Sequence, residues 1–216
     1  MSDQVPRAVP ARIRVLVADD HPVVRAGLAT VIAQEADLEL VAEAENGAQV
    51  VTLFREHHPD VVLMDLRMPV IDGVQAIRTI TAEYPAARIL ALTTYEGDGD
   101  IRRALEVGAW GYLLKDMLLT EVITAVRAVH RGERVIPPAV AVRLAEHPPG
   151  SDLTERELEV LTLVARGLAN KDVAGAIGRT DETVKVHLKN IFAKLRVTDR
   201  TEAVTVALAR GLIHLD

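Results

Sequence analysis

Short apolar runs alternate with amphipathic stretches between residues 12 and 131. Valine, isoleucine and leucine dominate the runs, which is typical of parallel strands that are buried on both faces of a sheet. The stretches between them carry apolar residues at helical spacing. The pattern predicts strands at 13–18, 38–43, 60–64, 88–92 and 110–114, and helices at 22–34, 47–57, 73–83, 98–107 and 119–130. Five strand–helix alternations predict a doubly wound α/β domain with a five-stranded parallel sheet.

After Ser151 the pattern predicts helices only. Thr154 and Glu157 have the spacing of a capping box, in which the two residues satisfy each other's free backbone N–H groups. Asn170 is expected to cap a short second helix, and Thr180 to cap a third helix after a tight turn. The four predicted helices run to about residue 167, over 170–177, over 181–195 and over 200–210.

Glycine and proline mark the boundary between these two parts. Gly132 can end the last helix of the α/β domain. Two proline pairs, 137–138 and 148–149, then bracket a segment with a short predicted helix at 138–146, and prolines this dense are typical of an interdomain linker. We therefore predict a loose N-terminal arm at 1–11, the α/β domain at 12–131, a linker at 132–150 and an all-α domain at 151–216.

Composition agrees with two small domains. The chain has 216 residues, of which 49% are hydrophobic but 3% aromatic, so the cores are expected to be aliphatic. The absence of cysteine excludes disulfides and thiolate metal sites. No apolar run reaches the roughly 18 residues of a membrane helix, and the N-terminus lacks a signal-peptide pattern. We expect a soluble, cytosolic protein without a membrane partner.

The net charge of −6 is unevenly distributed. Residues 151–216 contain ten acidic and ten basic side chains, so the first 150 residues hold the whole excess of acid. Within the all-α part, residues 179–200 contain six bases against three acids. A basic stripe on a neutral domain indicates a nucleic-acid contact. The alternative is a solvated helix face without a partner.

Five polar residues follow the ends of predicted strands. They are Asp19, Asp20, Asp65, Thr93 and Lys115. In a parallel α/β sheet the carboxyl ends of the strands meet at one crevice, so these side chains are expected to share a pocket. Each acid alone would more often be a solvated loop residue or a helix cap, but five complementary groups in this order favour a common site.

This mixture of groups suits Mg²⁺ and a phosphoryl group. Mg²⁺ prefers oxygen ligands and usually takes one or two protein carboxylates, so Asp20 and Asp65 are expected to bind it directly and Asp19 through a water. A carboxylate can attack a phosphoryl group to form an acyl phosphate, provided that the charge on that group is neutralised. Lys115 supplies a cation, and Thr93 can hydrogen-bond a phosphoryl oxygen.

A phosphohydrolase that passes through an aspartyl phosphate would need much of the same chemistry. Haloacid-dehalogenase-type phosphatases carry a second aspartate two residues after the nucleophile. Here that position is Arg67, which disfavours turnover of a small substrate.

Residues 12–131 resemble the receiver domain of bacterial two-component response regulators, which has a flavodoxin-like fold. The resemblance lies in Asp19-Asp20, 64–69, Asp72-Gly73, 92–94 and 111–116. It implies that Asp65 is the phosphoacceptor, with Asp19 and Asp20 as the acidic pocket and Lys115 as the phosphate partner. It also implies that Thr93 and Tyr112 form a switch, although an isolated Tyr112 would more often be a core aromatic. Trp110 departs from the small or polar residue expected from the family pattern, and Val70 stands where the family often has glycine, a minor change.

The predicted helix at 181–195 has one apolar face and one cationic face. Val184, Leu188, Ile191 and Leu195 fall within roughly an 80° sector and are expected to be buried. Lys185, Lys189 and Arg196 fall within about 40° of each other on another face. Val186 and Ala193 lie beside these cations, and His187, Asn190 and Lys194 flank the opposite edge. A short helix, a tight turn and this helix form a helix-turn-helix, whose second helix enters the major groove of DNA.

Residues 151–213 resemble the LuxR-type DNA-binding domain, through 153–161, 170–174, 183–187, 190–191, 194–195 and 199–203. The resemblance implies a DNA-binding set of Thr183, Lys185, Val186, His187, Lys189 and Asn190. Lys185, Val186 and Lys189 would face the groove, and His187 and Asn190 would lie near phosphates. Residues 178–181 are less apolar than the usual turn of this motif.

The order of the two domains is similar to that of the NarL/FixJ family of response regulators. This resemblance implies a transcription regulator, not an enzyme, that a sensor histidine kinase phosphorylates and that binds double-stranded DNA as a homodimer. The last helix, with Val204, Ala207 and Leu208, is a candidate dimer surface, although these residues fit a core role equally well. A regulator whose receiver domain serves only for dimerisation, independent of phosphorylation, is the alternative.

Overall fold

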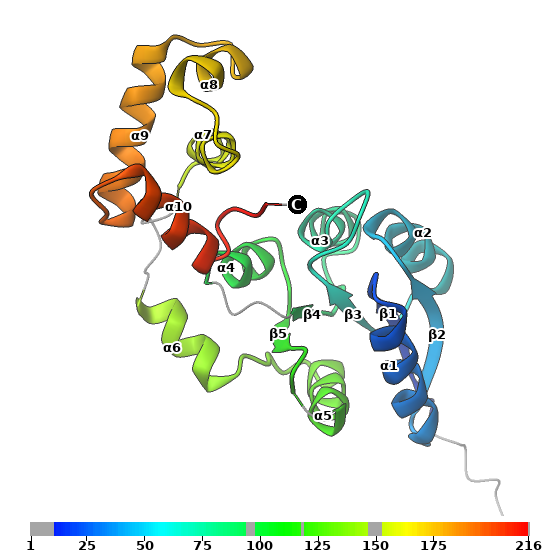
Figure 1. The fold of residues 1–216 in the computed structure, drawn as a ribbon. Coiled ribbons are helices and arrows are strands. Elements are labelled where there is room, and N and C mark those ends of the chain that lie inside the picture. Colours follow the sequence, from blue (N-terminus) through cyan, green and yellow to red (C-terminus); the bar gives the residue numbers. More distant parts are fainter. Residues whose placement is uncertain (1–10, 94–97, 118, 147–152, 216) are drawn as a thin grey trace, which may run out of the picture. The chain divides into compact units, whose positions relative to one another are not determined.

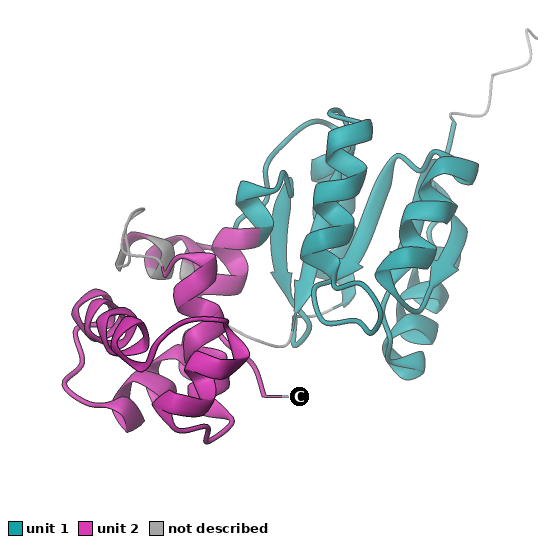
Figure 2. Ribbon diagram, turned by 90° about the horizontal axis from the view of Figure 1, so that it is seen from above, with its two compact units in different colours: residues 1–94, 104–136 teal, residues 95–103, 137–216 magenta. Residues whose placement is uncertain are grey.

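The computed structural model describes residues 11–93, 98–117, 119–146 and 153–215. Its internal contacts define two compact units (Figure 2): residues 1–94 with 104–136, and residues 95–103 with 137–216. The predicted arm, apart from Ala11, lies outside the described residues, as do residues 147–150 of the predicted linker and 151–152 of the predicted all-α domain. Within the described part of the chain, no helix combines the length and apolar character needed to cross a membrane.

A five-stranded parallel sheet forms the centre of the first unit, as predicted (Figure 1). The strand order is β2-β1-β3-β4-β5. The strand order reverses between β1 and β3. In parallel α/β sheets, ligands bind at the point of reversal, in a crevice outside the carboxyl ends of the strands. The strands are β1 Ile13–Ala18, β2 Leu38–Ala44, β3 Val61–Asp65, β4 Ile89–Thr93 and β5 Gly111–Leu114.

Helices cover both faces of this sheet. Leu28 and Ile32 of α1 and Val122 and Val126 of α5 pack with alternate β1 residues in one core cluster, because successive strand residues point to opposite faces. The helices α2 and α3 lie together on the other face. The helices are α1 Pro22–Gln34, α2 Gly47–His57, α3 Gly73–Glu83, α4 Asp98–Glu106 and α5 Leu119–His130. The residues of α4 divide between the two compact units.

The chain leaves α5 at Gly132, whose φ of 88° is left-handed, and Gly132 therefore ends the helix as predicted. The short predicted helix in the linker is also present, as α6 Pro138–Glu146.

Four helices surround the aliphatic core of the C-terminal part. They are α7 Glu155–Ala165, α8 Asn170–Ala176, α9 Asp181–Leu195 and α10 Arg200–Ala209. The capping box of Thr154 and Glu157 is confirmed, and Thr180 accepts a hydrogen bond from the backbone N–H of Thr183 as the N-cap of α9. Asn170 is not the cap of α8: Ala169 holds that position, and the Asn170 Oδ1 accepts a hydrogen bond from Arg200 Nη1 at 3.2 Å.

Candidate functional site

The carboxyl ends of the strands bring the predicted pocket residues together. Lys115, one residue after β5, places its Nζ 2.6 Å from Asp19 Oδ2 and 2.8 Å from Asp65 Oδ2. Asp19 follows β1, and Asp65 is the last residue of β3. Both carboxylates are buried, at 0% and 1% exposure, and Thr93 at the end of β4 is also fully buried. The sheet order therefore converts scattered positions in the sequence into one ion-paired cluster.

Burial dominates the acid–base behaviour of Asp65. Desolvation raises the pKa of Asp65 to about 6, although the hydrogen bond and charge of Lys115 act against this. The backbone N–H of Arg67 also donates to Asp65 Oδ1 at 3.1 Å, which favours the ionised form. Burial acts to lower the pKa of Lys115, but Asp19 and Asp65 outweigh it and raise that pKa. The lysine therefore remains a cation beside the candidate nucleophile.

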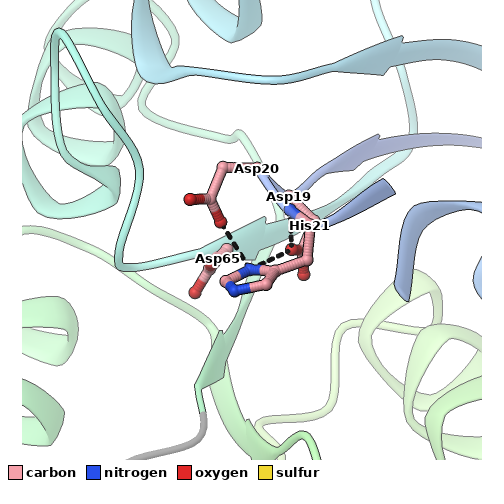
Figure 3. A group of neighbouring side chains, drawn as sticks. All are labelled: Asp19, Asp20, His21 and Asp65. Atoms are coloured by element: carbon pink, nitrogen blue, oxygen red, sulfur yellow. Dashed lines mark hydrogen bonds and ion pairs between the residues drawn. The ribbon is translucent and has the colours of Figure 1, made fainter. Parts of the chain in front are cut away.

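The acidic end of the pocket contains a residue that the sequence reasoning missed. One ligand atom from each of Asp19, Asp20, His21 and Asp65 lies within 4.8 Å of all the others (Figure 3). His21 Nδ1 lies 2.7 Å from Asp20 Oδ1 and 3.3 Å from Asp19 Oδ1. The signal was available, since His21 directly follows the aspartate pair, but nothing in the sequence says which way its ring points.

The carboxylates of this cluster fit a hard divalent cation. Asp19 Oδ2, Asp20 Oδ1 and Asp65 Oδ2 are buried oxygens. Lys115 Nζ forms ion pairs with those of Asp19 and Asp65, and His21 Nδ1 lies 2.7 Å from that of Asp20. Buried anionic oxygens need positive charge nearby. Oxygen ligands of this kind are those that Mg²⁺ selects.

The loop after β3 is held by an unusually close backbone contact. A Cβ atom added to Gly73 would lie 2.1 Å from the carbonyl oxygen of Asp65 and 2.7 Å from Leu66 Cα. The Gly73 N–H also donates to the Leu66 carbonyl at 3.0 Å. The start of α3 is therefore packed directly against the backbone that carries Asp65.

Val70 in the same loop has a left-handed backbone with a φ of 71°, and its side chain is 84% exposed. A β-branched residue is a genuine outlier in this region. The departure from glycine at this position is therefore not minor, because it stores strain of about 1–2 kcal/mol beside the pocket.

The two predicted switch residues lie on neighbouring strands. Thr93 ends β4, and its carbonyl accepts a hydrogen bond from the Lys115 N–H at 2.8 Å. Tyr112 lies on β5 and is completely buried, so its ring occupies an inward position in this structure. Trp110 packs against the core cluster of α1 and α5, and the Arg88 guanidinium lies 5.8 Å from the centre of its ring.

In the second unit, α9 presents the predicted faces. Its buried residues are Val184, Leu188, Ile191 and Leu195, as the periodicity indicated. Four residues of the predicted DNA-binding set are exposed, namely Lys185, Val186, Lys189 and Asn190, while Thr183 and His187 are half-buried. Val186 is 54% exposed, which is unusual for a large apolar side chain and suits contact with a thymine methyl group.

Arg196 departs from the predicted cationic face, and the flanking Lys194 forms an ion pair within the domain. Arg196 was placed on the cationic face by extending the helix, but α9 ends at Leu195 and Arg196 has a φ of 57°. Lys194 lies 2.7 Å from Glu157 Oε2, so it joins α9 to α7. On α10, Ala207 is buried and Val204 and Leu208 pack against the core, which supports the interpretation of these residues as core.

Known families match both parts of the chain. Residues 15–127 match the response regulator receiver domain. Residues 151–207 match the bacterial regulatory proteins of the luxR family. The two matches lie within the predicted α/β and all-α domains, in the predicted order.

Individual relatives extend over nearly the whole chain. The transcriptional regulatory protein LnrK of Bacillus subtilis (strain 168) is 39% identical over 216 residues, covering 93% of this chain and 98% of LnrK. The response regulator ChrA of a heme-sensing two-component system is 40% identical, with a TM-score of 0.56, and the match covers 94% of this chain and 100% of ChrA. A structure of two RcsB dimers bound to two parallel DNAs is 25% identical, with a TM-score of 0.66, covering 92% of this chain and 98% of that one.

A receiver fold followed by a LuxR-type helical domain defines a regulator of transcription and not an enzyme. The chain belongs to the two-component response regulators that combine a receiver domain with a LuxR-type DNA-binding domain.

Proposed function

We propose that Asp65 accepts a phosphoryl group from a sensor histidine kinase and that its phosphorylation controls DNA binding by α9. The observation that carries this proposal is the contact of Lys115 Nζ with both Asp19 and Asp65 at the buried ends of the strands. A buried carboxylate beside a fixed cation suits nucleophilic attack on a phosphoryl group, because the cation stabilises charge on the transferring oxygens. We further propose domain limits of 12–131 and 151–216, with 132–150 as the linker.

The proposed reaction is a simple displacement. An Asp65 carboxylate oxygen attacks the phosphorus atom of the phosphodonor, and the bond from phosphorus to the donor's nitrogen or oxygen breaks. Asp20 and Asp65 would hold Mg²⁺ directly, with Asp19 behind a water, and the ion would neutralise the phosphoryl oxygens. Lys115 remains paired with Asp19 and can turn from the Asp65 carboxylate to a phosphoryl oxygen.

Two alternatives keep parts of the same site. A regulator independent of phosphorylation would use the receiver domain only for dimerisation, yet the buried ion pairs around Asp65 are chemistry that a dimer surface does not need. A phosphohydrolase would need an acid–base group where Arg67 stands. A phosphotransfer assay on the wild type and on Asp65→Asn separates the three: stable labelling, no labelling, or continuous release of phosphate.

We propose that Thr93 and Tyr112 transmit phosphorylation to the surface formed by α4 and β5. A phosphoryl oxygen on Asp65 can accept a hydrogen bond from the Thr93 hydroxyl and draw it inward. The buried ring of Tyr112 would then be the inward state of a two-state element.

Thr93→Ala is expected to leave Asp65 open to phosphorylation but to reduce the gain in DNA affinity that phosphorylation brings. The alanine keeps the backbone contact with Lys115 and removes the hydroxyl that would sense the phosphoryl group, together with the γ-methyl group. Labelling of Asp65 and DNA affinity with and without phosphodonor are measured on the same preparation. Thr52→Ala on α2 serves as the matched control. A full gain in affinity in the Thr93 variant would contradict this route.

We propose that α9 enters the major groove, with Lys185, Val186 and Lys189 toward the bases and with Thr183, His187 and Asn190 near the backbone. The exposure of Lys185, Val186 and Lys189, outside the buried stripe of α9, supports this arrangement. The chain would bind as a homodimer, with each output domain on one half-site, as the RcsB dimers on DNA suggest. Both the phosphodonor and DNA lie in the cytoplasm, where we place the protein.

Lys189→Ala is expected to weaken binding to the operator by about 1–3 kcal/mol if its ammonium reads a base edge, with relaxed specificity at one position. If it contacts a phosphate, binding to all sequences should weaken alike and the salt slope should fall by about one. Both quantities come from titrations of operator DNA, selected with the wild type from random sequence, at several salt concentrations. Arg166→Ala, exposed at the end of α7, is the control. Unchanged affinity at every salt concentration would remove Lys189 from the interface.

A further inference from the structure

Lys185 lies between two acidic side chains at the start of α9. Its Nζ is 2.9 Å from Asp181 Oδ2 and 3.2 Å from Glu182 Oε2. The acids stand four and three residues earlier on the helix, the spacings at which side chains meet on one helical face. Asp181 first and Glu182 second raise the pKa of Lys185, so the lysine stays a cation beside the two carboxylates. The three groups together carry one excess negative charge.

The charge of α9 is therefore largely compensated within the protein. The helix contains three lysines, of which Lys194 pairs with Glu157 and Lys185 with two acids. Among the described residues, Lys189 is the lysine of α9 that no carboxylate approaches within ion-pair distance. The surface proposed to meet DNA thus presents far less free positive charge than its lysine content indicates.

Helix stability gives a partial account of the two acids. Carboxylates in the first turn interact favourably with the helix dipole, and any acidic residue there would do so. However, the N-terminal residues of a recognition helix are also those that approach the base edges. Acids at this place are repelled by DNA phosphates, and both of them contact the lysine proposed to face the groove.

We propose that Asp181 and Glu182 set the discrimination between operator and nonspecific DNA by holding Lys185 in the free protein. The inference rests on the proposed function of α9 as the DNA-reading helix. Nonspecific binding depends almost entirely on phosphate contacts that release counterions. Lys185 must leave two carboxylates to gain one phosphate oxygen, so its contribution to nonspecific binding is largely cancelled.

The contribution of Lys185 to the binding free energy differs on the operator. A lysine can bind the acceptor atoms of guanine in the major groove, and a carboxylate released from it can accept a hydrogen bond from the amino group of cytosine. The lysine and the carboxylate that separate from each other then both find new partners on the DNA bases. In a nonspecific complex, which depends on phosphate contacts, the carboxylates are not positioned on cytosine amino groups and only repel the phosphates. The two acids should therefore weaken nonspecific binding more than operator binding.

The test is the double variant Asp181→Asn, Glu182→Gln in the full-length chain. Its affinity for a random-sequence duplex and for the selected operator is measured at several salt concentrations. We expect the random duplex to bind roughly threefold to tenfold more tightly, with a salt slope steeper by about 0.9, because one more lysine is free for a phosphate. Operator affinity should rise less, so that the ratio of the two affinities falls.

Two further variants make the result decisive. Glu155→Gln with Glu159→Gln removes the same charge from α7, where both side chains are exposed. An equal loss of discrimination in this control would overturn the inference in favour of a net-charge effect. Lys185→Ala separates the two proposals. If this variant leaves both affinities unchanged, Lys185 does not contact DNA, and the proposed position of Lys185 in the major groove is wrong. If it weakens binding but the double variant behaves like the wild type, only the inference fails.

Folding is checked on the same samples by circular dichroism. Should the double variant be unfolded at the assay temperature, Glu182→Gln alone keeps the first-turn acid Asp181 and still removes one ion pair of Lys185. The expected changes are then smaller and have the same sign, and their absence would overturn the inference.

Discussion

Asp65→Asn is expected to abolish covalent phosphorylation and, at the same time, to stabilise the folded chain near neutral pH. The amide has nearly the shape of the carboxylate, but it lacks the anionic oxygen that attacks phosphorus. Stability should rise because a carboxylate at 1% exposure is poorly solvated, even beside Lys115. A protein that becomes more stable when its reactive group is removed is typical of a site selected for chemistry.

The sign of the pH dependence follows from the raised pKa. The ordinary pKa of an aspartate side chain is 3.8 and that of Asp65 in the fold is about 6, so the folded state holds this proton more tightly than the unfolded chain. The contribution of Asp65 to the free energy of unfolding is then fully present below 3.8 and is lost as the pH rises through about 6. Above that pH the ionised group destabilises the fold by an amount on the order of 1–3 kcal/mol, which Asp65→Asn should recover.

Both effects are measurable on one pair of proteins. Urea unfolding without Mg²⁺ at several pH values should show a gain in the variant at pH 7.5 that shrinks as the pH falls below 6. Labelling with acetyl phosphate is followed by intact mass, and chelation of Mg²⁺ should prevent it in the wild type. Asp37→Asn, before β2 at the opposite edge of the sheet, is the matched control and should label normally. A labelled Asp65→Asn protein would exclude Asp65 as the phosphoacceptor.

Much of this pocket was predictable because the topology of the sheet determines where most of its side chains lie. Asp19, Asp65 and Thr93 are polar residues at the ends of apolar runs, and a parallel sheet brings such ends to one edge. Their convergence needs no knowledge of side-chain conformation. The buried stripe of α9 was predictable for a similar reason, since helical periodicity alone fixes which residues share a face.

What the sequence left open depends on side-chain direction and on local backbone geometry. His21 could equally have pointed away from the aspartates, and the contact of its ring with Asp20 becomes evident only in three dimensions. In the sequence, Asp181 and Glu182 are typical acidic residues of a first helical turn, and their contacts with Lys185 become evident only from the distances. Asn170 was misplaced as a cap because a strong capping residue can be diverted, here by Arg200, to a tertiary hydrogen bond.

Gly73→Ala is expected to cause a large loss of stability, roughly 3 kcal/mol or more, together with a slower reaction at Asp65. The new methyl group would lie 2.1 Å from the Asp65 carbonyl oxygen and 2.7 Å from Leu66 Cα, and both of these are backbone atoms that no rotamer change can move. Relief requires that α3 shift away from the end of β3, which would stretch the bond from the Gly73 N–H to the Leu66 carbonyl. The sequence offered Asp72-Gly73 only as a matching motif, and this contact gives its physical reason.

The same shift would displace Asp65 relative to Lys115, and misplacement by about 1 Å can slow a reaction by about 100-fold. We therefore expect Gly73→Ala to show a labelling rate about 10- to 100-fold lower under conditions where it remains folded. Gly27→Ala is the matched control, because Gly27 lies inside α1 with nothing within 4 Å of the added Cβ. That variant should gain about 0.5–1 kcal/mol from helix propensity and label at the wild-type rate. If Gly73→Ala unfolds at the same urea concentration as Gly27→Ala, the close contact between α3 and the Asp65 backbone does not exist in solution.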